Sequence, residues 1–464
     1  MTSTTSSTST TRTTRTVIEN GYVATVDASG SEHARGHVVL EAGRILAVGD
    51  GPAPAHLREG AHVVDATGCL VTPGLINTHH HLYQWLTRGY AQDAILFDWL
   101  TALYPLWSRI DADLTGAGAA GAMAVLARSG CTTVGDHHYI FPAGSGDIMG
   151  ALVHAAARVG VRLHATRGSM DLGASQGGLP PDFAVETTAA ALAASHDAVV
   201  THHDDAPDAM VKIAIAPCSP FSVTADLLRE AAVLARDLEV RLHTHASETI
   251  EEDAYCAEHF GRTPTQYLED LGWLGPDVWM AHCVHLDAPA IERYAATGTG
   301  VAHCPSSNGR LAAGIAPVRD LLAAGVAVGL GVDGAASNES GQLGVEIRES
   351  VLMNRLRTGA DSLGVRAALR MATAGGARVL GRADHLGSLE VGKLADLVVW
   401  RVDGVEHAGI LDPVAALGLG ALPPIALSLV GGAPVVVDGA LATGEQDVIA
   451  REVAAASRAL AERA

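Results

Sequence analysis

Hydrophobic and polar positions alternate in a regular way over residues 73–385. Short apolar runs, of the length of buried strands, are separated by longer Ala- and Leu-rich stretches with helical spacing, such as residues 116–130 and 224–239. The eight strand candidates are residues 74–81, 131–138, 161–168, 211–220, 240–248, 278–285, 300–308 and 326–334. Regular strand–helix alternation favours a parallel sheet, and eight such units predict an α/β fold with a TIM-type (β/α)8 barrel.

The two ends of the chain follow a different pattern. In residues 17–72 and again in residues 386–448, short segments of alternating apolar and polar residues break at Gly or Asn-Gly, which is typical of β-hairpins. We therefore expect one small β-sandwich module that both chain termini form together. Residues 449–464 are expected to form a C-terminal helix, and the Ser- and Thr-rich residues 1–16 a disordered tail.

Composition narrows the classes of protein. The 464 residues are 48% hydrophobic and 18% charged, which allows a large core and argues against global disorder. The formal net charge of -20 argues against a nucleic-acid binder, whose surface is basic, and agrees with a neutral small-molecule substrate. Six scattered cysteines indicate reduced thiols, no apolar run reaches about 20 residues, and the N-terminal residues lack the apolar segment expected of a secretory signal. We expect a cytoplasmic protein without membrane or nucleic-acid partners.

Most strand candidates end in polar residues, at the edge where a barrel of this type carries its active site. The first candidate ends in three histidines, and side chains on a strand alternate between two faces. His79 and His81 therefore point together into the barrel mouth, whereas His80 points away. Such a pair of imidazoles suits Zn²⁺ at about 2.0–2.1 Å. An isolated pair with this spacing is also common in a polar surface turn.

Three further strand ends carry residues of the same chemistry. His245 lies near the end of the fifth strand candidate, His282 near that of the sixth and Asp333 near that of the eighth. Each alone is weak evidence, but together with His79 and His81 they favour a metal site over chance. In this site His245 is the third imidazole ligand and Asp333 the carboxylate ligand. His282 is expected beside the water that the metal ion activates.

Several segments resemble the amidohydrolase superfamily, and more narrowly its branch of deaminases and chlorohydrolases. They are "PGLINTHHH" (73–81), "HASE" (245–248), "AHCVH" (281–285), "GVDGAASN" (331–338) and, in the C-terminal part of the β-module, "GSLEVGKLADLVV" (387–399). More narrowly still, "HHHLYQWLTR", "GCTTVGDHHYIFP", "GGLPPD" and "APCSPFSV" look like segments of 8-oxoguanine deaminases. The resemblance implies hydrolytic deamination of an aminopurine, with 8-oxoguanine converted to urate and ammonia.

The resemblance also implies a mechanism with one divalent metal ion, Zn²⁺, which lowers the pKa of water towards neutrality. Glu248 would protonate a ring nitrogen of the substrate, and Asp333 would take a proton from the water and pass it to the leaving amine. His282 would hold and polarise this water. A glutamate after a strand also commonly starts a helix. Because triazine chlorohydrolases of this branch can lack the acid, Glu248 favours deamination over dechlorination.

Residues that contact the substrate are less clearly marked. Gln84 can hydrogen-bond a purine edge or cap a helix, and Arg167 can reach a substrate carbonyl or form a structural ion pair. One of His137 and His138 is expected to face the pocket, with His138 taken as the candidate, and His285 is expected to line it. Packing or structural roles are favoured for other polar and aromatic residues, namely His243, Cys218, Ser219, His303, Asn308, Trp85, Trp99, Tyr104 and Trp107.

Other functions stay open at this point. The substrate can instead be guanine, a pterin such as isoxanthopterin, or a triazine, the last through deamination or dechlorination. A non-enzymatic barrel that serves as an interaction scaffold is disfavoured, because such a protein should have lost metal ligands, and this chain keeps the complete set. Members of the family are commonly oligomers, so the resemblance implies a homo-oligomer.

Overall fold

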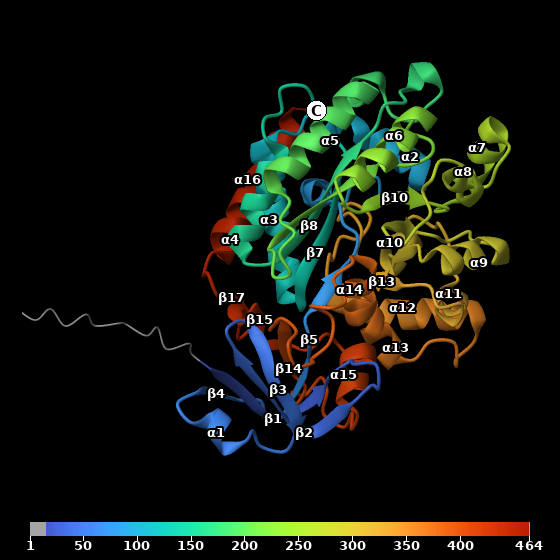
Figure 1. The fold of residues 1–464 in the computed structure, drawn as a ribbon. Helices are drawn as coiled ribbons and strands as arrows, with labels where there is room; N and C mark the ends of the chain where they lie inside the picture. The colour runs from blue at the N-terminus through green and yellow to red at the C-terminus, as the bar shows by residue number, and fades with distance from the viewer. Residues whose placement is uncertain (1–14, 464) are drawn as a thin grey trace, which may run out of the picture.

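The computed structural model describes residues 15–463 and contains a closed barrel of eight parallel strands (Figure 1). The strands are β6 (Leu75–Asn77), β7 (Cys131–His138), β8 (Arg162–Ser169), β9 (Val211–Pro217), β10 (Leu242–Ala246), β11 (Val278–His282), β12 (Gly300–His303) and β13 (Val328–Leu330). Pairing of β13 with β6 and of β9 with β10 completes the ring. Each strand coincides with one predicted segment, so the (β/α)8 barrel is confirmed.

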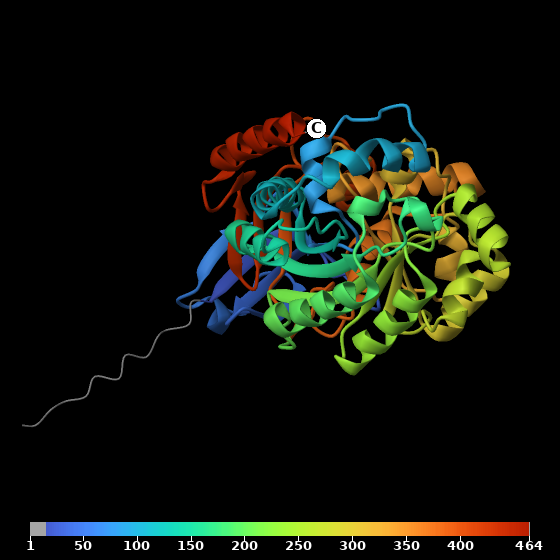
Figure 2. The ribbon, with the colours of Figure 1, turned by 90° about the horizontal axis from the view of Figure 1, so that it is seen from above.

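Helices surround the barrel, as the view from above in Figure 2 shows. Side-chain caps explain where several begin, because Asp111 accepts the backbone N–H of Leu114 and Thr224 accepts that of Leu227. The helices between the barrel strands and after β13 are α3 (Ala112–Arg128), α4 (Ile148–Val159), α5 (Thr188–His202), α6 (Ala225–Asp237), α7 (Ile250–Phe260), α8 (Pro264–Asp270), α9 (Ala288–Thr297), α10 (Pro305–Arg310), α11 (Val318–Ala323), α12 (Leu343–Thr358), α13 (Val365–Arg370) and α14 (Gly376–Val379).

A long excursion rich in aromatic residues lies between β6 and α3. It contains a 3-10 helix, η1 (Leu82–Thr87), and the helix α2 (Leu96–Trp107). The buried residues of α2 recur at spacings of three and four, so they form one face of the helix. This face covers the carboxyl ends of the barrel strands, where Leu96, Trp99 and Tyr104 share a cavity with residues of the strand tips.

Strands from both chain ends form one mixed sheet of nine strands, here called the terminal sheet. Its order is β17-β16-β15-β14-β5-β1-β2-β3, with β4 paired to β1. The strands are β1 (Thr16–Ala24), β2 (Glu32–Glu41), β3 (Arg44–Asp50), β4 (His62–Asp65), β5 (Cys69–Pro73), β14 (Leu397–Arg401), β15 (Ile425–Val430), β16 (Ala433–Val437) and β17 (Ala440–Leu441). β5 and β14 join the two ends, with Val71 opposite Val399. The strands thus pair continuously rather than in two separate sheets.

The barrel and the terminal sheet are joined by a buried ion pair. The guanidinium of Arg162 on β8 donates to both carboxylate oxygens of Asp396, at 2.8 and 2.9 Å. The helix α16 (Gln446–Glu462) lies in the segment where a C-terminal helix is expected and contacts α3. Two short helices, α1 (Ala55–Arg58) and α15 (Pro413–Leu419), complete the α-helices of the described residues, which also contain the 3-10 helices η2 (Ala174–Gln176) and η3 (Asp182–Ala184) and the π-helix η4 (Met371–Gly375). Of the expected tail, residues 1–14 lie outside the described residues, and Thr16 already belongs to β1.

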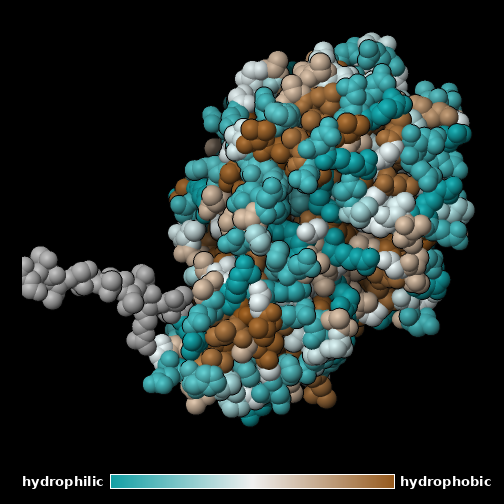
Figure 3. All heavy atoms as spheres, in the orientation of Figure 1, coloured by the Kyte–Doolittle hydropathy of each residue, from teal (hydrophilic) through white to brown (hydrophobic). Residues whose placement is uncertain are grey.

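The described part of the chain is further characterised by the hydropathy of its helices, by its cysteines and by its surface hydropathy, which is shown in Figure 3. No helix within residues 15–463 is long and apolar enough to cross a membrane. All six cysteines are buried and unpaired. Figure 3 shows hydrophilic and hydrophobic residues interspersed over one face of the molecule, with a larger hydrophobic area over the terminal sheet.

Candidate active site

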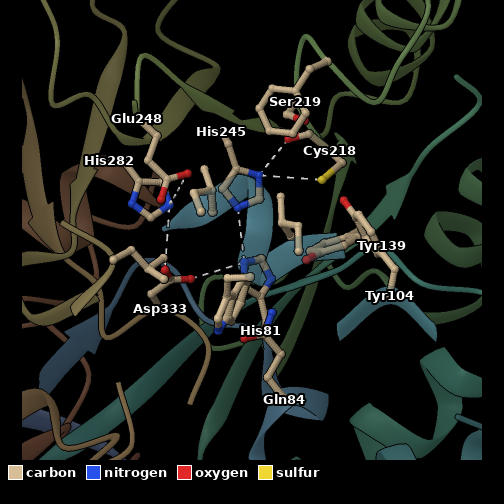
Figure 4. A pocket seen from close by; sticks show the side chains of 15 residues that line it. His81, Gln84, Tyr104, Tyr139, Cys218, Ser219, His245, Glu248, His282 and Asp333 are labelled. Atoms are coloured by element: carbon tan, nitrogen blue, oxygen red, sulfur yellow. Dashed lines mark hydrogen bonds and ion pairs between the residues drawn. The ribbon is translucent and has the colours of Figure 1, made fainter. Parts of the chain in front are cut away.

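A small cavity of about 30 Å³ lies at the carboxyl ends of the barrel strands (Figure 4). We call one side the strand-tip wall, which consists of His81, Cys218, Ser219, His245, Glu248, His282 and Asp333. We call the other side the aromatic wall, which consists of Leu96, Trp99, Leu100, Tyr104, Tyr139, Phe221 and Leu311. Gln84 of η1 completes the lining. The lining thus combines the histidines and carboxyl groups of the strand tips with a largely apolar set of residues.

Candidate metal ligands converge on the strand-tip wall. Ligand atoms of His79, His81 and His245 lie within 4.8 Å of one another, and so do those of His79, His282 and Asp333. Asp333 Oδ1 is 3.3 Å from His79 Nε2 and 3.2 Å from His81 Nε2. His80 is buried but belongs to neither group. The alternation of side chains along the strand end therefore brings together the residues that the sequence indicates.

The proton positions on two of these histidines follow from their hydrogen bonds. His81 Nδ1 donates to the carbonyl oxygen of His137 at 2.6 Å, and His245 Nδ1 donates to that of Cys218 at 2.7 Å. Carbonyl oxygens only accept, so both Nδ1 atoms carry hydrogen and both Nε2 atoms keep their lone pairs when the rings are neutral. These Nε2 atoms lie 3.2 Å apart. Two facing lone pairs repel each other unless a cation lies between them.

The spacing of the donor atoms fits a tetrahedral divalent ion. Bonds of about 2.0–2.1 Å to Zn²⁺ place tetrahedral ligand atoms roughly 3.3–3.4 Å apart. The three contacts among His79 Nε2, His81 Nε2, His245 Nε2 and Asp333 Oδ1 measure 3.2 to 3.3 Å. His79 Nε2 is buried and has no hydrogen-bond partner among the described residues. The strand tips therefore form a histidine-rich metal site.

The pKa values of the two carboxyl groups in the site, Asp333 and Glu248, are shifted in opposite directions. Burial acts to raise the pKa of Asp333, but its close contacts with the imidazoles of His79 and His81 outweigh burial and hold the pKa well below its usual range. Burial, and then the negative charge of Asp333, raise the pKa of Glu248 well above its usual range. Asp333 is thus kept ionised, whereas Glu248 favours its protonated form. Paired carboxyl groups with separated pKa values are typical of sites that need both a base and an acid.

Helix α10 provides hydrogen-bond partners for both Asp333 and His282. Ser307 Oγ donates to Asp333 Oδ2 at 2.6 Å, and the next residue, Asn308, accepts from His282 Nδ1 at 2.9 Å through its Oδ1. His282 Nε2 then faces the acids, 3.7 Å from Glu248 Oε2 and 3.9 Å from Asp333 Oδ2. The sequence predicts that Asn308 orders its loop, and the structure adds this contact with His282.

The backbone at the strand tips adopts a conformation that is rare for residues other than glycine. The φ angle is 71° at His282 and 64° at Asp333, and it is 52° at Ser247, just before Glu248. Such positions cost on the order of 1–3 kcal/mol each and cluster at functional sites, where surrounding contacts hold them. One of these contacts is the carboxylate of Glu252, which accepts the backbone N–H groups of Ser247 and Glu248 at 2.9 Å.

Of the four candidate substrate contacts, Gln84 lines the cavity. Both polar atoms of its amide are buried without a hydrogen-bond partner among the described residues. Gly334 permits this position, because a Cβ atom there would lie 1.8 Å from Gln84 Oε1. An unpaired buried amide beside a cavity is costly unless a ligand or water satisfies it.

The other three candidates lie outside the cavity lining and bond to the protein itself. Arg167 forms a two-pronged ion pair with Glu186 at 2.7 and 2.8 Å. His138 Nε2 lies 2.8 Å from the carbonyl oxygen of Ile140, and His285 Nε2 lies 2.9 Å from that of Ala313. The structural ion pair, one of two alternatives for Arg167, is therefore present. His137 also lies outside the lining.

Sequence reasoning missed most of the aromatic wall. Tyr139 and Phe221 follow β7 and β9 directly or within a few residues, and an aromatic residue just after a strand tip is the only signal that could have indicated them. The sequence favours packing roles for Trp99 and Tyr104, and the structure shows that both pack in the core and also line the cavity. The sequence predicts packing for Cys218 too, and it likewise reaches the cavity.

Comparison with known proteins gives the class of this protein. A model described as the amidohydrolase family matches residues 70–438, which is most of the chain. The chain therefore belongs to the amidohydrolase family, in its branch of deaminases and chlorohydrolases. Together with the histidine-rich metal site, this confirms the prediction of a hydrolase that acts on C–N bonds.

Particular relatives narrow the branch further. The chain is 44% identical over 432 residues to an 8-oxoguanine deaminase of Pseudomonas aeruginosa, covering 92% of this chain and 96% of that protein. It is 38% identical to an isoxanthopterin deaminase from an unknown prokaryotic organism, covering 82% and 83%. Among solved structures, an atrazine chlorohydrolase of Arthrobacter aurescens complexed with zinc superposes with a TM-score of 0.90 at 32% identity, covering 95% of this chain and 100% of that one.

Proposed function

We propose that this protein deaminates 8-oxoguanine to urate and ammonia with one Zn²⁺ ion held by His79, His81, His245 and Asp333. The observation that carries the proposal is the pair of carboxyl groups beside the metal site, one held ionised and one that favours its proton. Hydrolytic deamination needs both, because one proton must leave the water and another must reach the substrate ring. The 44% identity with an 8-oxoguanine deaminase supports the choice of substrate.

When bound, the metal ion activates water as a nucleophile at neutral pH. His282 holds this water, and Asp333 takes one of its protons as the oxygen attacks the ring carbon that bears the amine. Glu248 gives its proton to the adjacent ring nitrogen, so that negative charge does not build up on the ring. Asp333 then passes its proton to the amine, which leaves as ammonia. The new hydroxyl group gives its proton to Glu248 and becomes the carbonyl of urate. Glu248 is then protonated and Asp333 ionised, as at the start.

Recognition of the oxidised ring is assigned to Gln84. Compared with guanine, 8-oxoguanine adds an N7–H donor and a C8 carbonyl acceptor, and the amide of Gln84 offers one acceptor and one donor group. Both are unpaired in the cavity lining, which supports this role. The roles first expected for His138, Arg167 and His285 have less support, because each is bonded to its own chain.

The test is a comparison of kcat/KM for 8-oxoguanine, guanine and isoxanthopterin under one set of conditions. A site that hydrogen-bonds a distinguishing group can reject an analogue lacking it by roughly 10⁴–10⁵-fold, because its own polar groups then stay unpaired. We expect 8-oxoguanine to be preferred. A preference for isoxanthopterin, in line with the second relative, would overturn the substrate and leave the metal mechanism standing.

Two further proposals concern the protein in the cell. We propose a homo-oligomer, which is supported by the family resemblance, and light scattering of the purified protein tests it. A single-chain mass would contradict it. We also propose a cytoplasmic location, which the six buried, unpaired cysteines support, because disulfides are rare in that compartment. Fractionation of cells that express the full chain tests this, and recovery in an exported fraction would contradict it.

A further inference from the structure

A chain of hydrogen bonds runs beneath the metal site, away from the cavity. His79 Nδ1 lies 2.8 Å from His243 Nε2, and His243 Nδ1 lies 2.9 Å from the carbonyl oxygen of Trp279. The His243 ring is buried and stacks on the indole of Trp279, with ring centres 4.4 Å apart and an angle of 14° between the planes. His79, two residues after the end of β6, is thereby linked in one line to groups on β10 and β11.

The hydrogen on each nitrogen of this chain can be assigned from one end to the other. A carbonyl oxygen only accepts, so His243 Nδ1 carries the hydrogen. The His243 ring has no carboxylate among its hydrogen-bond partners and lies against an indole, so it stays neutral and its Nε2 accepts. His79 Nδ1 must then be the donor, which leaves the lone pair of His79 Nε2 directed at Asp333 and the metal site.

The other two imidazole ligands obtain the same tautomer in a different way. His81 and His245 both donate their Nδ1–H to backbone carbonyl oxygens, at 2.6 and 2.7 Å. Among the three imidazoles, His79 alone relies on a side chain as the acceptor. Its tautomer and its ring orientation can therefore be changed by a substitution elsewhere in the barrel, whereas those of His81 and His245 are fixed by the main chain.

We propose that His243 is a positioning residue that fixes the tautomer and the orientation of His79 and thereby sets the affinity of the site for its metal ion. The proposal rests on the metal site of the proposed function. Partners that orient a metal-binding histidine typically change metal affinity by about 10–100-fold when they are removed. His243 does not line the cavity, and of the candidate ligands it hydrogen-bonds to His79, so its effect on Zn²⁺ passes through His79.

The experiment uses two amide substitutions that differ by one methylene group. In His243→Gln the side chain is long enough to place an acceptor where Nε2 lies, whereas in His243→Asn it reaches only as far as the Nδ1 position. The control is His164→Asn, because His164 is also buried and also packs against Trp279, with ring centres 5.5 Å apart, but does not contact His79. Zn²⁺ affinity is measured on metal-free full-length protein by competition with a chromogenic chelator, and folding by thermal unfolding.

We expect His243→Asn to weaken Zn²⁺ binding by about 10–100-fold, and His243→Gln to stay within a few-fold of wild type. His164→Asn should leave the affinity unchanged. Equal affinities for wild type and a folded His243→Asn would overturn the proposal, and so would a His243→Gln variant as weak as His243→Asn. If His243→Asn does not fold, weak binding by folded His243→Gln still overturns it.

The assay also separates this proposal from the proposed function. Substrate is absent from the measurement, so a wild-type protein that binds Zn²⁺ but does not deaminate 8-oxoguanine leaves the role of His243 intact and overturns only the function. A wild-type protein that binds no Zn²⁺ overturns both.

Discussion

The strand-tip wall and the aromatic wall line the same cavity but are built on different principles. Four side chains of the strand-tip wall, those of His81, His245, His282 and Asp333, each have a hydrogen-bond partner, such as Ser307 for Asp333 or Asn308 for His282. The aromatic wall comes largely from helix α2, and its residues are held mainly by apolar packing. Hydrogen bonds thus fix the positions of side chains that are proposed to take part in the reaction, whereas apolar packing shapes the part of the cavity that would enclose the substrate ring. We expect substitutions on the strand-tip wall to change kcat and those on the aromatic wall to change KM.

The largest effect is expected from removing the carboxylate ligand of the strand-tip wall. The Asp333→Asn variant lacks the negative charge that balances the metal ion, and it also lacks the base. Because a bound metal ion contributes several kcal/mol of transition-state stabilisation, activity should fall by roughly 10³-fold or more. Elemental analysis should find about one Zn²⁺ per wild-type chain and much less in the variant. Asp361→Asn, on an exposed loop, is the control. Two tightly bound ions per wild-type chain would contradict the single site.

Glu248→Gln should lower activity by roughly 10²–10⁴-fold, because only the proton donor is lost, and should retain the metal ion. Since the pKa of Glu248 is raised, the protonated form persists to higher pH, and the wild-type kcat/KM should fall as pH rises through that pKa. The variant should lack this limb. Glu251→Gln, in the first turn of α7, should behave as wild type. A metal-loaded Glu248→Gln enzyme with near wild-type rate would exclude this proton shuttle.

Gln84→Met tests recognition between the two walls. The substitution keeps length and removes the amide, so kcat/KM for 8-oxoguanine should fall by about 10–100-fold, as expected for one or two lost hydrogen bonds. The value for guanine should change much less, since guanine lacks the C8 carbonyl. Gln92→Met, at an exposed residue, serves as the control. Parallel losses for both substrates would mean that Gln84 does not read the oxidised ring.

The smallest effect is expected on the aromatic wall. Trp99→Phe removes a hydrogen bond from Nε1 to the carbonyl oxygen of Ala336 and some ring area, so we expect a rise in KM of a few-fold with kcat kept, and a loss of stability of about 1 kcal/mol. Trp107→Phe loses a comparable bond to Thr87 but does not line the cavity. Its stability should fall similarly with KM unchanged. A large drop in kcat for Trp99→Phe alone would break the division between the walls.

The two walls also differ in how far the sequence predicts them. The barrel and the strand-tip wall are predictable because strand ends place polar residues at one edge, so His79, His81, His245 and Asp333 stand out against apolar runs. The aromatic wall follows the same helical spacing as ordinary core residues. The sequence pattern therefore does not distinguish a residue such as Trp99, which both packs and lines the cavity, from an ordinary core residue.

The contacts of side chains across loops are the part that sequence patterns do not reveal. Arg167 ends a barrel strand, as expected for a pocket residue, but Glu186 returns from a later loop and pairs with it. No periodic pattern in the sequence predicts that Glu186 lies next to Arg167. In the same way, His243 is predicted to be a structural histidine, but only the distance between its Nε2 and His79 Nδ1 reveals which ligand it orients.

The most direct test of the account follows the oxygen atom from water into the product. Metal-loaded enzyme is incubated with 8-oxoguanine in water enriched in ¹⁸O, and urate and ammonia are quantified with mass analysis of the urate. We expect one ¹⁸O atom in each urate and one ammonia for each urate formed, with turnover lost in metal-free enzyme and restored by Zn²⁺. Failure to form urate, or urate without the label, would contradict hydrolytic deamination of 8-oxoguanine at this site.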